Sequence, residues 1–373
     1  MTGKPAILVL GQLPPPYMGP AIATEIILQS RLKDDWTLIH MDTNTHSSLE
    51  TIGTITASRL ISNFRLYIRM ILLLLRHKPD LTLIPISQTT MGFLKDSVFV
   101  IISRVFRTTT LLQLRGSNFR NWLASTSKIM QAYVSFSLKR TQGVIVLGNN
   151  LRYLFSNFFP PDKIFVVPNG ADFPVLPSSK KEMEKTRLLY LANLQGSKGI
   201  EDVISAVQKL KGRSSVGSLE LNVIGDWFSD GIKGKVLDTV RSQELPVIFH
   251  GIAVGDRKWK FLSEADIFIF PPREPEGHPW VIIEAMAAGL PIISTDQGAI
   301  TESVIDGLNG FIVDPGRPDQ IAEKIMLLMQ NAELRMKMGQ ESRRLYEEKF
   351  TGEKMVERLT YAFHAVLAER CAE

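Results

Sequence analysis

Short apolar runs rich in β-branched residues alternate with segments of helical periodicity along the whole 373-residue chain. These runs are nearly continuous in hydrophobicity, which predicts strands that are buried on both faces. Strands of that kind form parallel sheets with helices packed on both sides. The predicted strands are Ala6–Leu10, Thr37–Met41, Leu81–Ile84, Leu111–Leu114, Gly143–Leu147, Ile164–Val167, Leu188–Leu191, Leu219–Ile224, Val247–His250, Ile267–Phe270 and Pro291–Ser294.

The segments between these runs predict the connecting helices, and one break in the pattern predicts a domain boundary. Prolines, serines and charges at Phe173–Lys185 are typical of a linker. We therefore expect an α/β protein of two Rossmann-like doubly wound domains, residues 1–175 and 186–352, facing a central cleft, with a helix at about 353–373 packing back on the first. The predicted helices are Ala21–Arg31, Arg59–His77, Trp122–Lys139, Ile200–Leu210, Lys258–Glu264, Val281–Ala288 and Pro318–Gln330.

Composition excludes several other classes of protein. Hydrophobic residues make up 45% and charged residues 22%, a composition that can bury a large core. The single cysteine, Cys371, excludes a disulfide framework and fits a reducing cytoplasm. The first apolar run is too short for a signal peptide. The longest, Met70–Leu75, is far below the roughly 20 residues that a membrane span needs, so we expect none.

Positive charge is concentrated in the first half of the chain. Residues 1–177 contain 18 Lys and Arg against 9 Asp and Glu, whereas the rest contains 25 against 29. This asymmetry indicates either a polyanionic partner of the first half or simply a solvated basic surface.

The stretch Glu276–Pro291, "EGHPWVIIEAMAAGLP", carries the clearest sign of a binding site. Glu276 precedes a predicted helix that starts at Pro279, and Glu284 lies inside it, so both carboxylates can lie near one helix end. That end offers free N–H groups for a phosphate, and the carboxylates suit sugar hydroxyls. This pattern favours a nucleotide-sugar site, although spacing alone also fits two solvated glutamates.

The longer run Glu276–Pro315 resembles the signature of the retaining glycosyltransferases of family four, which have the GT-B fold. Its elements are two Glu separated by seven residues, then Ala-Met-Ala-x-Gly-x-Pro, then a Gly and a Glu, then Asn-Gly. Three other segments resemble the family in the expected order: Gly11–Ala21, Val166–Asp172 and Tyr190–Ala206. The likeness therefore covers nearly the whole chain.

The resemblance implies a role for each matching residue. Glu276 would orient the donor sugar, Lys198 would neutralise the diphosphate, and Glu284 would hold the ribose hydroxyls. Gly19 would let a loop of the first domain approach the diphosphate. The remaining implied donor contacts are Asn193, His278, Pro279, Trp280 and Val281.

The chain departs from the family pattern at five positions. Asn193 stands where the family usually has Arg, so one charge for the diphosphate is missing. Pro20 follows the loop Gly in place of a second Gly, which removes an N–H donor. His278 and Pro279 replace an aromatic residue and a Gly, and His278 either contacts the sugar or fills the loop. Arg115 replaces a His before Gly116, which makes it a candidate contact for the acceptor or a phosphate.

The resemblance implies a hexosyltransferase that retains anomeric configuration and uses a nucleotide-diphosphate sugar as substrate. No Asp-x-Asp, Walker or Gly-x-Gly-x-x-Gly motif occurs, and the histidines do not cluster, so we expect no metal and no cofactor. The alternative is a non-catalytic GT-B protein that binds sugar nucleotides or glycans. A nucleic-acid partner is not expected, since no known binding module is present.

The acceptor is expected to come to the basic first domain. Residues 59–163 contain 15 Lys and Arg but only three acids, all Asp. The segment Arg59–Lys78 mixes basic and apolar residues at helical spacing, which suits an anionic membrane surface or else a core helix with solvated arginines. We expect a cytoplasmic protein, peripheral on the inner face of the membrane. Its acceptor would be a glycan or polyprenyl-diphosphate-linked glycan of cell-surface polysaccharide or lipopolysaccharide synthesis.

Overall fold

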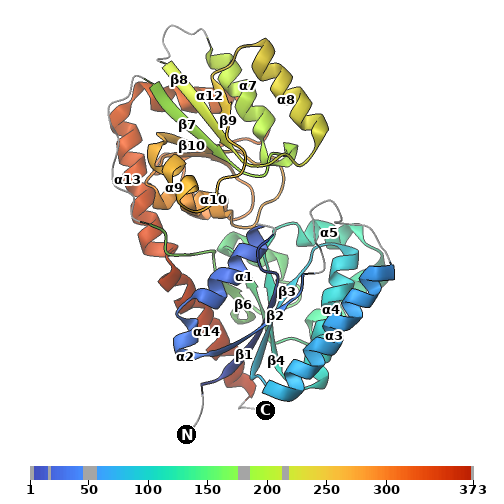
Figure 1. Ribbon diagram of the computed structural model, residues 1–373. Helices are drawn as coiled ribbons and strands as arrows, with labels where there is room; N and C mark the ends of the chain where they lie inside the picture. Colours follow the sequence, from blue (N-terminus) through green and yellow to red (C-terminus); the bar gives the residue numbers. More distant parts are fainter. Residues whose placement is uncertain (1–3, 16–17, 45–56, 175–184, 212–217, 371–373) are drawn as a thin grey trace. The chain divides into compact units, whose positions relative to one another are not determined.

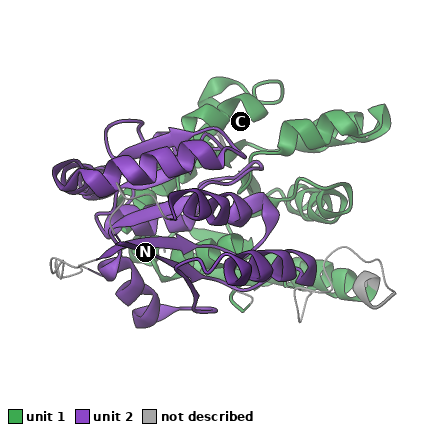
Figure 2. Ribbon diagram, turned by 90° about the horizontal axis from the view of Figure 1, so that it is seen from above, with its two compact units in different colours: residues 1–171, 352–373 green, residues 172–351 purple. Residues whose placement is uncertain are grey.

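A computed structural model describes residues 4–15, 18–44, 57–174, 185–211 and 218–370 (Figure 1). The chain divides into two compact units (Figure 2). Unit 1 contains residues 1–171 and 352–373, and unit 2 contains residues 172–351. Most of the linker predicted at Phe173–Lys185 lies outside the described residues, since residues 175–184 are not among them.

The described part of unit 1 contains a six-stranded parallel sheet in the order β2-β1-β3-β4-β5-β6. Helices cover both faces of this sheet (Figure 1). Its strands are β1 Ala6–Gly11, β2 Thr37–Asp42, β3 Leu81–Ile86, β4 Thr109–Leu114, β5 Gly143–Val146 and β6 Ile164–Val166. Its helices are α1 Gly19–Gln29, α2 Leu32–Asp35, α3 Ala57–His77, α4 Thr90–Val105, α5 Phe119–Ser125, α6 Lys128–Leu138 and α14 Gly352–Arg370, with short 3-10 helices at Asn149–Leu154 and Pro161–Lys163.

The last helix of the chain, α14, completes the core of unit 1. Leu359 and Phe363 are fully buried in a cluster with Ile7 of β1 and Leu111 of β4. Trp36 packs edge-on against Phe363 at 5.5 Å between ring centroids. The two ends of the chain therefore share one hydrophobic core, and a chain shortened before α14 would expose it.

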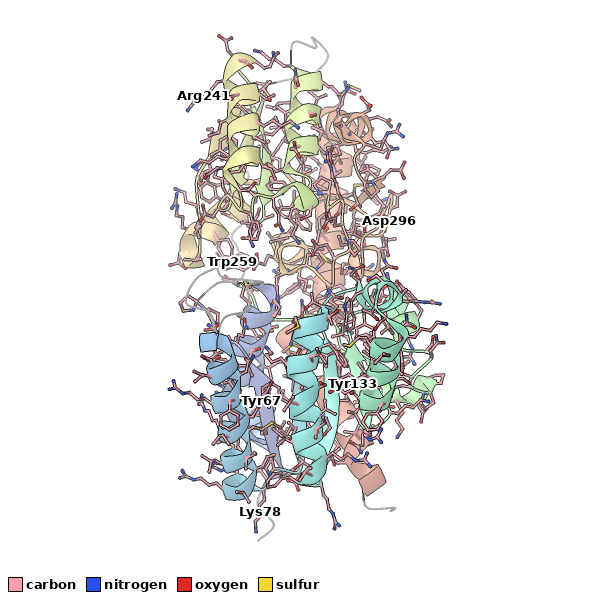
Figure 3. The ribbon with its side chains drawn as sticks, turned by 90° about the vertical axis from the view of Figure 1, so that its right-hand side faces the viewer. Tyr67, Lys78, Tyr133, Arg241, Trp259 and Asp296 are labelled. Carbon is pink, nitrogen blue, oxygen red and sulfur yellow. The ribbon has the colours of Figure 1, made fainter. Side chains whose placement is uncertain are left out.

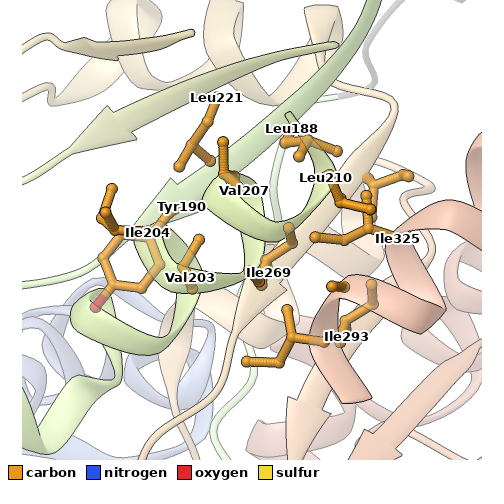
Figure 4. Packing of buried hydrophobic residues seen from close by; sticks show 14 of the residues in the cluster. Leu188, Tyr190, Val203, Ile204, Val207, Leu210, Leu221, Ile269, Ile293 and Ile325 are labelled. Carbon is orange, nitrogen blue, oxygen red and sulfur yellow. The ribbon is translucent and has the colours of Figure 1, made fainter. Parts of the chain in front are cut away.

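The described part of unit 2 contains a second six-stranded parallel sheet, in the order β12-β11-β10-β7-β8-β9. The helices α7 and α12 cover one face through a core of aliphatic residues and Tyr190 (Figure 4). Its strands are β7 Lys185–Leu191, β8 Ser218–Ile224, β9 Val247–Phe249, β10 Ile267–Phe270, β11 Ile292–Thr295 and β12 Gly310–Val313. Its helices are α7 Ile200–Leu210, α8 Asp230–Ser242, α9 Gly255–Glu264, α10 Trp280–Ala287, α11 Ile300–Ser303, α12 Pro318–Gln330 and α13 Ala332–Lys349, with the 3-10 helix η4 at Gly196–Lys198.

These sheets confirm the predicted α/β fold class, and each predicted strand overlaps an observed one. One predicted helix was wrong: Trp122–Lys139 is two helices, α5 and α6, rather than one. The break occurs where the Thr126 hydroxyl donates to the Leu123 carbonyl oxygen at 2.7 Å and the Ser127 hydroxyl caps α6. Hydroxyl side chains that bond to nearby backbone groups compete with helix continuation.

Candidate functional site

The sheet of unit 2 reverses its strand order beside β7. The chain builds β7, β8 and β9 in one direction and then crosses back to place β10 on the other side of β7. Doubly wound folds bind ligands at such a reversal of strand order, outside the carboxyl ends of the strands. Lys198 lies in the loop after β7, and Glu276 lies in the loop after β10.

Backbone contacts hold these two loops together. The Arg273 N–H donates to the Ser197 carbonyl oxygen at 2.8 Å. Gly199, which follows Lys198, has a φ of 79°, and a Cβ there would lie 2.0 Å from the Pro271 carbonyl oxygen. Glycine is required because only a residue without a side chain permits this approach and this conformation. The position of Lys198 is thus fixed against the β10 loop.

Lys198 and Glu276, predicted separately from the sequence, are in contact. The Lys198 Nζ donates to Glu276 Oε1. Both side chains are largely buried, and burial raises the pKa of the Glu276 carboxyl while the Lys198 ammonium opposes the rise. The pair offers one positive and one negative group side by side, which suits a ligand with a phosphate next to a hydroxyl-rich sugar.

The Glu276 loop rests on a third segment that starts at Gly298. The Ala299 N–H donates to the Gly277 carbonyl oxygen at 2.8 Å. Gly298 has a φ of 59°, and a Cβ there would lie 1.8 Å from the Glu276 carbonyl oxygen. The Gly of the sequence signature therefore supports the backbone of Glu276. The Asn-Gly of the same signature is also structural here, since buried Asn309 bonds to the backbone of Ser303 and Ile305.

Glu284 lies on α10 and is 4% exposed. Its Oε1 accepts a hydrogen bond from the Lys258 Nζ of α9 at 2.6 Å. Burial raises the pKa of Glu284, and the ammonium of Lys258 counteracts the rise. Lys258 was not predicted, because the helical pattern of α9 gives no sign that one of its lysines faces a glutamate 26 positions later.

The start of α10 differs from prediction by one residue. Pro279 is the residue before the helix, and Trp280 is its first residue, so Pro279 has an extended rather than a helical ψ of 129°. Trp280 is buried and Val281 is partly exposed. No acidic side chain lies in this first turn, which leaves the positive end of the helix dipole without an acid of its own.

His278 is directed into the protein. Its ring is 3% exposed, its Nε2 lies 2.6 Å from the Ser303 hydroxyl, and it packs against Phe350 at 5.1 Å. Of the two alternatives left open by the sequence, this geometry favours a residue that fills the loop. Asn193, in contrast, is exposed.

A second unpredicted cation, Arg273, lies in the β10 loop. Its Nε and Nη2 donate to the two oxygens of Asp202, both at 2.6 Å. Asp202 is 2% exposed and lies in the first turn of α7, where an acid is favourable for the helix dipole. This bidentate ion pair holds the β10 loop against α7. No sequence motif marks it, because the partners are 71 residues apart.

The other two predicted residues, Gly19 and Arg115, belong to unit 1. Gly19 is the first residue of α1. Arg115 follows β4 and lines a cavity at the carboxyl end of the unit 1 sheet. In the part of the chain that the structure describes, no three His, Cys, Asp or Glu residues are arranged to hold a metal ion. No helix among those residues is both long and apolar enough to cross a membrane.

Comparisons with known proteins show which family and which relatives the chain resembles. Residues 175–345 match the family "Glycosyl transferases group 1". The chain is 26% identical to the capsular polysaccharide biosynthesis glycosyltransferase CapM of Staphylococcus aureus over 327 residues, 83% of each chain. It is 26% identical to the lipopolysaccharide 1,2-N-acetylglucosaminetransferase of Salmonella typhimurium over 231 residues, 58% of this chain and 60% of the other.

Solved structures share the fold. HepE of Anabaena, crystallised in complex with UDP, superposes with a TM-score of 0.74 at 14% identity, covering 97% of this chain and 100% of the other. At this identity the likeness concerns the fold alone, and it confirms the expected GT-B type of two α/β units.

Proposed function

Because residues 175–345 match the family "Glycosyl transferases group 1", we propose that this chain is a retaining, metal-independent glycosyltransferase that uses a nucleotide-diphosphate sugar. The observation that carries the proposal is the pair of carboxylate–lysine contacts in unit 2, Glu276 with Lys198 and Glu284 with Lys258. They lie on loops and helices at the switch point of the sheet, where a nucleotide sugar would bind.

In this proposal each pair receives one part of the donor. Only Oε1 of Glu284 contacts Lys258, so Oε2 is available to accept from the ribose hydroxyls. Lys198 turns its ammonium to the diphosphate, and Glu276 then accepts from the sugar hydroxyls. Asn193 adds no charge, so Lys198 and the N-terminus of α10 supply the positive potential for the phosphates.

The chemistry that follows needs no protein nucleophile. The bond between the anomeric carbon and the diphosphate oxygen breaks, and its electron pair stays on the diphosphate. The acceptor hydroxyl oxygen bonds to the same face of that carbon and gives its proton to the departing diphosphate oxygen. Lys198 stabilises the negative charge that develops on the leaving group, an electrostatic contribution that grows in the transition state.

A thermal-shift panel tests the donor site. Purified protein, its Glu284→Ala variant and a control, Glu274→Ala, are heated with UDP-, GDP-, ADP- and TDP-sugars. Glu274 is exposed in the same loop as Glu276, so its loss removes an equal charge and, of the influences on the pKa of Glu276, only the smallest. We expect one donor to stabilise wild type and Glu274→Ala but not Glu284→Ala, and release of its sugar to continue in EDTA. A folded protein that responds to no donor, or a response that Glu284→Ala retains, contradicts the site.

We further propose that the acceptor is a glycan of the cell surface, presented on a lipid at an anionic membrane. Helix α3 supports this, since it contains no acidic residue and buries Leu66, Met70 and Leu74 on one face. Its other face exposes large apolar side chains between arginines, and α4 lies beside it (Figure 3). The exposed apolar residues of the two helices are Ile61, Phe64, Ile68, Leu72, Leu75, Met91, Leu94, Ile101 and Val105.

Vesicle sedimentation tests this surface. Apolar side chains flanked by arginines bind anionic lipid through both burial and charge. We expect the protein to pellet with phosphatidylglycerol vesicles, less with phosphatidylcholine, and much less after Phe64→Ser with Leu72→Ser. The control Leu327→Ser removes an exposed leucine from unit 2. Equal pelleting of all variants would remove α3 from the proposal.

A further inference from the structure

Unit 1 has its own switch point, with a cavity beside it. In the order β2-β1-β3-β4-β5-β6 the chain passes from β2 across β1 to β3, so the loops after β1 and β3 diverge. A cavity of about 370 Å³ opens there, lined by the ends of β1, β3 and β4 and by the start of α4. Doubly wound folds bind ligands at this position.

Arg115 lies in the wall of this cavity and has no acidic partner among the described residues. Its Nη1 donates to Asn169 Oδ1 at 3.0 Å, and its Nη2 donates to Gln113 Oε1 at 3.1 Å. Both acceptors are neutral amide oxygens, and a guanidinium has five N–H donors, so three remain. No carboxylate of the described residues forms an ion pair with Arg115. Burial lowers its pKa to about 9, which leaves it charged at neutral pH.

The other charged residues of the wall neutralise each other. Asp96 Oδ2 accepts from the backbone N–H and the hydroxyl of Ser87, at 2.9 and 2.6 Å. Its Oδ1 lies 3.4 Å from the Lys95 Nζ. The net charge of the lining is therefore one positive charge, that of Arg115. Hydroxyl and amide side chains form the polar remainder of the wall: Gln12, Thr24, Thr43, Ser87, Gln88, Thr89 and Gln113.

We propose that this cavity binds an anionic group of the sugar substrate, either a carboxylate or a phosphate, on the guanidinium of Arg115. A half-buried charge with only neutral partners costs free energy that a bound anion would recover. The planar fork of an arginine matches the two oxygens of a carboxylate or phosphate. The surrounding hydroxyl and amide groups suit the hydroxyls of the attached sugar. This inference rests on the proposed function, and it specifies that the substrate carries an anionic group.

Titration with small probes tests the inference. The full-length protein is titrated calorimetrically with D-glucuronate, inorganic phosphate and D-glucose at constant ionic strength. The variants are Arg115→Gln, Arg115→Lys and the control Arg120→Gln, which removes an exposed arginine of the next helix. We expect at least one anion to bind saturably and glucose not to bind. Affinity should fall about tenfold or more in Arg115→Gln, fall less in Arg115→Lys, and stay unchanged in Arg120→Gln.

The outcomes separate the two sources of the anion. Binding of glucuronate alone would identify the substrate as an acidic sugar, and binding of phosphate alone would identify it as a phosphorylated one. Binding of both would show that the cavity selects for negative charge. Anion binding that Arg115→Gln retains, or no binding of either anion, overturns the inference. If Arg115→Gln does not fold, Arg115→Lys decides, because it keeps the charge and loses the fork.

A parallel titration keeps the inference separate from the donor site. The same probes are applied to Glu284→Ala, which lacks the proposed ribose contact in unit 2. Arg115-dependent anion binding should persist there. A protein that binds anions but no nucleotide sugar would contradict the proposed function alone, and one that binds nucleotide sugars but no anion through Arg115 would contradict this inference alone.

Discussion

In unit 2, each of the three cations described beside the switch point contacts a carboxylate: Lys198 with Glu276, Lys258 with Glu284 and Arg273 with Asp202. In unit 1, Arg115 follows β4 and lines the cavity beside the switch point, and it donates only to two amide oxygens. Both units are doubly wound parallel sheets, so the difference comes from loop and helix residues and not from the fold.

The two arrangements have different consequences for a ligand. A ligand that reaches Oε1 of Glu276 competes with the contact that Lys198 already makes, so the net gain from that contact is small, whereas Oε2 of Glu284 accepts from a ligand without displacing Lys258. A ligand that reaches Arg115 would supply its first negative partner. Unit 2 should therefore depend on its ion pairs for both stability and activity. Unit 1 should keep its stability when Arg115 is replaced, and the replacement should weaken only the binding of substrate.

The largest effect should come from the Glu276 carboxylate. Glu276→Ala is expected to lower kcat about 10²- to 10³-fold, since it removes both a sugar contact and the partner that positions Lys198. Steady-state kinetics with the donor found in the panel measure the change. Glu274→Ala should keep wild-type kcat. A Glu276→Ala enzyme with normal kcat would show that the carboxylate is not part of the reacting constellation.

The glycines of the two sites sharpen the comparison. Gly298→Ala should lower the free energy of unfolding by about 2 kcal/mol or more, because φ is 59° and the new Cβ would overlap the Glu276 carbonyl oxygen. Gly116→Ala in unit 1 should lower it by less than about 1.5 kcal/mol, since the nearest atoms belong to the movable side chain of Gln88. Urea unfolding of both variants measures the difference.

A third glycine controls for strain alone. Gly307 has a φ of 75°, and a Cβ added there would meet no atom within 4 Å, so Gly307→Ala carries the conformational cost without the overlap. Gly298→Ala should therefore be the more damaging of the two. Equal losses would mean that the Glu276 loop moves aside freely and is not held by this contact.

Sequence reasoning located the fold and the carboxylates because both have local signals. Apolar runs such as Ile267–Phe270 identify buried strands, and the spacing of Glu276, Glu284 and the small residues after them follows from one loop and one helix. The predicted roles of these residues remain predictions until donor binding is measured.

The partners of those carboxylates had no local signal. Lys258 and Arg273 reach their acids across 26 and 71 residues of sequence, through contacts that exist only after the sheet has formed. The break between α5 and α6 at Thr126–Ser127 was missed for the opposite reason. The hydroxyls there bond to nearby backbone groups, and this local effect ends the helix although the helical periodicity of the sequence continues.

Removal of one cation from each unit tests the comparison through stability. Lys258→Met leaves the buried Glu284 unpaired and should cost about 1–2 kcal/mol at pH 8. Without Lys258 the pKa of Glu284 rises further, so the Glu284 carboxyl keeps its proton to a higher pH in the folded state than in the unfolded state. Stability then falls as pH rises, and the deficit should be smaller at pH 5 than at pH 8.

Arg115→Gln provides the contrast in unit 1. It leaves no carboxylate unpaired, because its two partners are amides that a glutamine can also contact. We expect its thermal midpoint to stay close to that of wild type at both pH values. A loss as large as that of Lys258→Met would show that Arg115 serves structure and would weaken the contrast between the units.

The smallest expected effect is a difference in pH dependence. Burial raises the pKa of Glu276 and of Glu284, so these carboxylates lose acceptor capacity at a higher pH than ordinary glutamates. Donor affinity should fall as pH drops towards 5, by less than about tenfold per pH unit for each carboxylate. Anion binding to Arg115 should persist between pH 5 and 8 and weaken only near its pKa of about 9.

Burial also raises the pKa of Asp96, and its protonation would remove a negative charge from the cavity and favour the anion as pH falls. Titrations with the donor and with glucuronate across this range should therefore diverge, and parallel profiles would mean that one site binds both.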